Sequence, residues 1–114
     1  MTTAADELRT AANKLLALTD AATPGPWATA DGTIPHGHRV GTVDKTGWVA
    51  WTGAITEERS EADAAFIAAM HPGVASAIAA WLQVEAFRVL HNGRNAITHH
   101  ALAVARAING GEQR

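Results

Sequence analysis

The chain has 114 residues, 47% of them apolar, which is enough for one compact domain and too few for two ordinary ones. A formal net charge of -2 and a pI near 6.3 exclude a general electrostatic attraction to nucleic acid or anionic membranes. The absence of cysteine excludes disulfides and thiolate metal sites. No apolar run approaches the roughly 20 residues needed to span a bilayer, so we expect a single cytoplasmic domain, residues 1–114, outside the membrane.

The first predicted element is an amphipathic helix over residues 3–19, with Thr3 as its N-cap. Its apolar side chains recur at the spacing of one helical face: Leu8, Ala11, Ala12, Leu15 and Leu18. The segment ATPGPW, residues 22–27, ends this helix, because neither Pro24 nor Pro26 fits a helix interior.

Residues 27–52 are rich in β-branched, aromatic and glycine residues, which predicts a β region. A hairpin is expected with its loop at Lys45, Thr46 and Gly47. Because a lone hairpin is marginal in water, residues 27–30 should add a third strand, or the hairpin should lie against helices, or both. Regular alternation in the last strand would place Trp48 on one face of the sheet and Trp51 on the other.

Three further helices are predicted over residues 60–70, 73–91 and 95–109. We expect Ser60 to cap the first, Pro72 to separate it from the second, and Asn95 to cap the third. Apolar residues cover more than half of helix 73–91, which predicts a central place in the packing. The predicted fold is α+β: a small antiparallel sheet of two or three strands packed with about four helices in one domain.

The order of ATPGPW, a short β segment and DAAFIAA-x-x-P, at residues 63–72, resembles the Ea22-like (Ead) family of small phage and prophage proteins. The ending ALAVARAINGG, residues 101–111, is similar to tails of its actinobacteriophage branch. The resemblance implies a phage-encoded accessory protein in the host cytoplasm. It supplies no catalytic residue.

The six histidines are the first candidate metal ligands, with Asp31, Asp44 or a histidine of the last helices as a third ligand. His36 and His38 are two residues apart, so both rings leave one face of an extended segment, as a shared Zn²⁺ or Ni²⁺ would need. The alternative is a solvated loop, which we favour because a closed zinc site needs four ligands. His91, His99 and His100 are expected at the surface. We therefore predict no metal and no other cofactor.

The four tryptophans carry the main functional hypothesis. Trp27 and Trp81 are expected in the core, whereas at least one of Trp48 and Trp51 should be exposed. An exposed tryptophan near basic residues is a typical binding surface for a protein or a stacked base. The candidate binding residues are Trp48, Trp51, Arg39, His38 and Lys45.

No arrangement of residues indicates an enzyme. Four of the five carboxylates that could do acid–base work lie near a helix start, where negative charge is favoured anyway: Glu57, Glu58, Glu61 and Asp63, with Glu85 the exception. The leading hypothesis is a non-enzymatic binding protein that self-associates, with a dimer as the first choice, and binds a host protein rather than nucleic acid. The alternatives are a protein that binds or sequesters a nucleotide-type ligand and, more weakly, a metal-dependent hydrolase built on His36 and His38.

Overall fold

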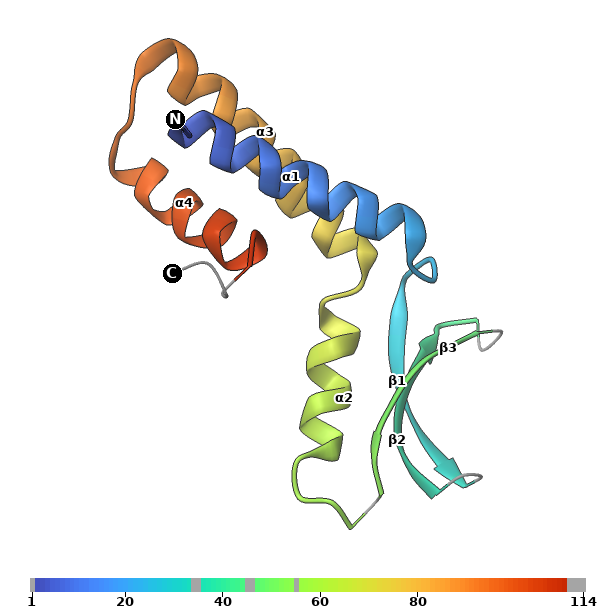
Figure 1. Cartoon of the computed structure of the whole chain (residues 1–114). Helices are drawn as coiled ribbons and strands as arrows, with labels where there is room; N and C mark the ends of the chain where they lie inside the picture. The colour runs from blue at the N-terminus through green and yellow to red at the C-terminus, as the bar shows by residue number, and fades with distance from the viewer. Residues whose placement is uncertain (1, 34–35, 45–46, 55, 111–114) are drawn as a thin grey trace. The chain divides into compact units, whose positions relative to one another are not determined.

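The computed structural model describes residues 2–33, 36–44, 47–54 and 56–110. It has an α+β fold with the N-terminal helix first and a three-stranded antiparallel sheet (Figure 1). The elements in chain order are α1 (Ala4–Ala21), β1 (Trp27–Thr33), β2 (His36–Thr42), β3 (Trp48–Gly53), α2 (Ser60–Ala69), α3 (Pro72–Asn92) and α4 (Ala96–Ile108). The predicted fold class is confirmed.

The chain divides into two compact units. The helical unit contains Met1–Asp20 and Ala75–Arg114, and the sheet unit contains Ala21–Val74. Each unit has buried side chains of its own. The prediction of a single domain with one core therefore stays a prediction.

The core of the helical unit is made mostly of alanine. Leu8, Leu82 and Leu102 are its largest buried apolar side chains, one from each of α1, α3 and α4. Around them lie seven buried alanines: Ala5, Ala11, Ala12, Ala79, Ala86, Ala101 and Ala105. Because alanine extends only one carbon from the backbone, such side chains fill a core only where the neighbouring helices pack closely. Figure 1 shows α1 and α3 running antiparallel in this unit.

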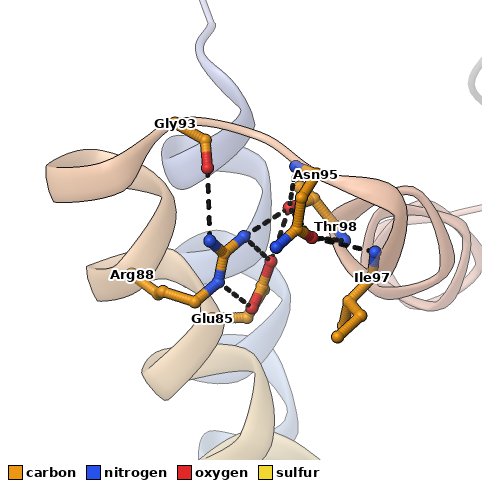
Figure 2. A network of polar contacts seen from close by, with 6 residues as sticks. All are labelled: Glu85, Arg88, Gly93, Asn95, Ile97 and Thr98. Carbon is orange, nitrogen blue, oxygen red and sulfur yellow. Dashed lines mark hydrogen bonds and ion pairs between the residues drawn. The ribbon is translucent and has the colours of Figure 1, made fainter.

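A buried carboxylate joins α3 to α4 in the helical unit. Glu85 is 4% exposed and accepts two hydrogen bonds from Arg88, at 2.9 and 2.7 Å, and one from the hydroxyl of Thr98, at 2.6 Å (Figure 2). Arg88 also donates to Thr98 and to the carbonyl oxygen of Gly93. The bonds from Arg88 outweigh burial and lower the pKa of Glu85 from 4.5 to about 2. Glu85 therefore fixes the turn between the two helices.

Two of the three predicted helix caps are confirmed. The hydroxyl of Thr3 accepts from the backbone N–H of Asp6, and Asn95 accepts from the backbone N–H groups of Ile97 and Thr98. The predicted Ser60 cap is wrong. Ser60 is already helical, and its hydroxyl is buried and donates to the carbonyl oxygens of Ala54 and Glu57.

The sheet unit places β2 between β1 and β3, with α2 in contact with all three strands. Val40, in the central strand, is fully buried, and Ala64 of α2 is 1% exposed. The third predicted strand exists and extends to Thr33. One face of this small sheet is therefore covered by α2.

The two segments that carry the family resemblance meet in the sheet unit. As predicted, α2 ends before His71 and α3 begins at Pro72. A Cβ placed on Gly25 would lie 3.0 Å from His71 Nδ1 and 3.4 Å from Pro72 Cδ. The backbone of the PGP turn thus packs directly against the helix corner, which leaves little room for a side chain at position 25.

Two sequence expectations about apolar segments need correction. Within the described residues, α3 is long and apolar enough to cross a membrane by length and composition, so the expectation of no such segment is wrong on those two criteria. They do not separate a spanning helix from the core helix of a soluble protein.

Trp81 is 38% exposed and is not a core residue, whereas Trp27 is half-buried and donates from its indole to the carbonyl oxygen of Thr23.

Candidate functional site

Trp48 and Trp51 lie on the same face of the sheet. In the pairing of β2 with β3, Arg39 is opposite Trp51, Val40 is opposite Ala50, and Gly41 is opposite Trp48. The register shifts between His38 and Arg39 and again between Val40 and Gly41, so one residue of β3 is skipped each time. Because paired residues in an antiparallel sheet point to the same side, both tryptophans share the side of Arg39. The predicted placement on opposite faces is wrong, since a bulge interrupts the two-residue alternation between them.

This face combines large and very small residues. Gly37 and Gly41 share it with Arg39, because they are separated by two positions along β2. A Cβ on Gly37 would collide with the indole nitrogen of Trp51 and would come within 2.6 Å of the carbonyl oxygen of Gly53. The indole of Trp51 therefore lies across the backbone at Gly37. We call the surface formed by these five residues, Gly37, Arg39, Gly41, Trp48 and Trp51, the Trp face.

Arg39 lies between the two tryptophans. It is the strand partner of Trp51, and its guanidinium carbon is 4.3 Å from the centroid of the Trp48 ring. This cation–π contact contributes on the order of 0.5–1 kcal/mol at an exposed position. Trp48 and Trp51 remain 57% and 52% exposed. The result is a preorganised surface with two open aromatic rings and one cation.

His38 belongs to the opposite face of the sheet. Its Nδ1 lies 2.7 Å from the hydroxyl of Ser60, and its carbonyl oxygen accepts from Thr52. The predicted grouping of His38 with Trp48, Trp51 and Arg39 is therefore not found. Lys45, the remaining predicted binding residue, lies outside the described residues.

The histidines do not form a metal centre in the part of the chain that the structure describes, where no three His, Asp or Glu side chains gather. The side chain of His36 lies outside that part. His91, His99 and His100 are exposed, as expected. His91 packs on Phe87 with ring centroids 4.1 Å apart, and its Nδ1 lies 2.8 Å from the Phe87 carbonyl oxygen.

Gly37 and Gly41 belong to the site but were not predicted as members of it. The available signal was the alternation in HGHRVG, residues 36–41, where glycines two residues on either side of Arg39 vacate the same face. Glycines in a central strand are unfavourable unless another group packs over them. Here Trp51 covers Gly37, which explains the pattern.

No family model matches this chain, and no curated protein or solved structure proved similar to it.

Proposed function

We propose that the protein is a non-enzymatic binding protein and that the Trp face contacts its partner. One observation carries this proposal: Trp48 and Trp51 are both more than half exposed on one side of the sheet, with Arg39 between them. Tryptophan and arginine are the residues that most often dominate the energy of protein–protein contacts. Leaving two indoles in water is unfavourable unless another surface covers them.

A protein partner suits the Trp face better than a stacked base. The guanidinium of Arg39 already occupies one side of the Trp48 ring, so a base would have to displace it or use the outer side. The indole of Trp51 lies against the backbone at Gly37, an arrangement that favours broad contact over enclosure of a small molecule.

We further propose that the partner is a host protein and that the chain is a phage or prophage accessory protein acting in the host cytoplasm and self-associating. The support is the resemblance of residues 22–27 and 63–72 to the Ead family. The contact of Gly25 with His71 and Pro72 gives a physical reason for those two segments to occur together.

The test is affinity capture from an actinobacterial host lysate with a matched set of variants. We expect a host protein to be retained by the wild-type chain and lost when Trp48→Ala and Trp51→Ala are combined. Phe66→Ala is the control, because Phe66 is a 69% exposed aromatic residue in the same unit. Equal capture by all three proteins would contradict the role of the Trp face.

A nucleotide-type ligand is the second candidate, since Arg39 and the two indoles provide a cation beside aromatic rings. A thermal-shift screen separates the two. A rise in Tm with a nucleotide, absent in Trp48→Ala, would favour this ligand over a protein.

A further inference from the structure

The outward side of α3 is an uncovered apolar surface. Val84, Phe87 and Leu90 are 68%, 65% and 62% exposed, whereas Ala79, Leu82 and Ala86, on the other side of the same helix, are buried. Trp81 and Phe87 alone expose on the order of 200 Å², since a large aromatic side chain has roughly 150–250 Å² to bury. With Val84 and Leu90 the patch reaches the size that is often functional on a small protein.

Five of the exposed residues of α3 lie at heptad spacing. Ala77, Ala80, Val84, Phe87 and His91 are spaced by three, four, three and four residues, and all five are exposed. This is the a/d spacing of a helix that packs along a second helix. We call these five residues the α3 seam. It lies opposite the face that is buried in the helical unit.

The α3 seam carries no carboxylate, lysine or arginine. The only two such residues in α3, Glu85 and Arg88, bind each other and Thr98. A surface whose charges all have the same sign would repel an identical surface. The α3 seam has no such charges to repel a second copy. None of its five positions is a lysine or arginine, whereas helices that lie on membranes are rich in lysine and arginine on their polar side.

Small and large residues lie at opposite ends of the seam. Ala77 and Ala80 are in its first half, and Val84 and Phe87 follow. In an antiparallel pair, Phe87 of each copy faces Ala77 of the other, and Val84 faces Ala80, so each large side chain meets a small one. A parallel pair would place Phe87 against Phe87 and Ala77 against Ala77, leaving a gap.

We propose that a second copy of this chain docks on the α3 seam, forming an antiparallel two-fold dimer in which Phe87 packs on Ala77 of the partner. The pair is isologous, so the same surface serves both copies. Because the contact involves one helix face, well below the ~800 Å² per partner of a standard interface, we expect dissociation in the micromolar range. This inference specifies the self-association in the proposed function and does not involve the Trp face.

Sedimentation equilibrium over a concentration series tests the proposal. We expect a monomer–dimer equilibrium for the wild-type chain and at least a tenfold weaker one for Val84→Arg, which places a charge at the seam of both copies. Ala103→Arg is the matched control, because Ala103 is exposed on α4. The combined Trp48→Ala and Trp51→Ala variant should dimerise like the wild type.

Cross-linking tests the direction of packing. Because the chain has no cysteine of its own, any disulfide must form between the introduced cysteines. Ala77→Cys alone and Phe87→Cys alone should form few disulfide dimers. In the antiparallel pair, each position lies ~15 Å along the helix axis from the same position in the partner copy. Mixed together, the two variants should cross-link readily. Efficient cross-linking of each variant with itself would overturn the antiparallel arrangement.

Two outcomes would overturn the dimer itself: a monomer at every concentration, or an unchanged equilibrium in Val84→Arg. A monomeric wild-type chain that pellets with phosphatidylglycerol vesicles through the seam would show that the seam binds lipid instead. Sedimentation reports self-association and host-protein capture reports the Trp face. Failure of one proposal is therefore distinguishable from failure of the other.

Discussion

At the scale of single residues, hydrogen bonds to Glu85 offset the cost of burying its charge. Its carboxylate receives three hydrogen bonds, two from Arg88 and one from Thr98. Replacing Glu85 with glutamine keeps the shape but removes the charge that Arg88 pairs with. We expect Glu85→Gln to lower the free energy of unfolding at pH 7 by about 2 kcal/mol, because the guanidinium of Arg88 stays partly buried without its carboxylate partner. Denaturant titration measures this, with exposed Glu58→Gln as the control.

The same residue predicts a pH dependence of stability. The folded pKa of Glu85 is about 2, below its ordinary 4.5, so its stabilising effect is complete above pH 4.5 and is lost as the pH falls toward 2. Asp6 and Glu7 also have lowered pKa values, through hydrogen bonds from Thr3 and Arg106 respectively, and contribute in the same direction. Glu85→Gln should therefore lose less stability than the wild type between pH 4.5 and 2. Parallel curves for the two proteins would contradict this.

Gly37 lies beneath the indole of Trp51, which makes this position sensitive to a larger residue. A methyl group there would meet the indole of Trp51 and the carbonyl oxygen of Gly53, which belongs to the neighbouring strand. We expect Gly37→Ala to lower the free energy of unfolding by about 1–3 kcal/mol, the usual cost of overpacking. It should also change the tryptophan fluorescence of the folded protein, since the ring of Trp51 must move. An unchanged emission spectrum would show that Trp51 does not lie over Gly37.

At the scale of elements, the start of α4 is fixed by a capping box. The side chain of Asn95 accepts from the backbone N–H of Thr98, and the hydroxyl of Thr98 accepts from the backbone N–H of Asn95. Asn95→Ala should lower the free energy of unfolding by about 1 kcal/mol. Asn92→Ala, at the exposed end of α3, is the matched control and should change it by less than about 0.5 kcal/mol. Equal effects would mean that the cap is not what Asn95 contributes.

At the scale of the whole molecule, the question is whether the two units unfold together. Neither is large, and domains of about 60 residues bury only about 60% of their unfolded surface, so each is marginal alone. We therefore predict one cooperative transition. Fluorescence follows mainly the sheet unit, which holds Trp27, Trp48 and Trp51, and far-UV circular dichroism follows mainly the helical unit.

The variant Leu102→Ala sharpens this test, because Leu102 is 1% exposed in the core of the helical unit. Removing it should lower the free energy of unfolding by about 2–5 kcal/mol. If the units are coupled, both signals shift to the same new midpoint. A shift of the circular dichroism signal alone would show that the units unfold independently.

The sequence by itself determined the elements and their order. Helical periodicity, the prolines at 24, 26 and 72, and Asn95 located the helices to within two residues, because these signals act within a few residues of the chain. Tertiary structure alone decided the site. The bulge between Trp48 and Ala50 places Trp48 and Trp51 on one face of the sheet. The hydroxyl of Ser60 contacts His38 and does not cap α2. Strand register and side-chain partners depend on segments far apart in sequence, so local spacing does not contain them.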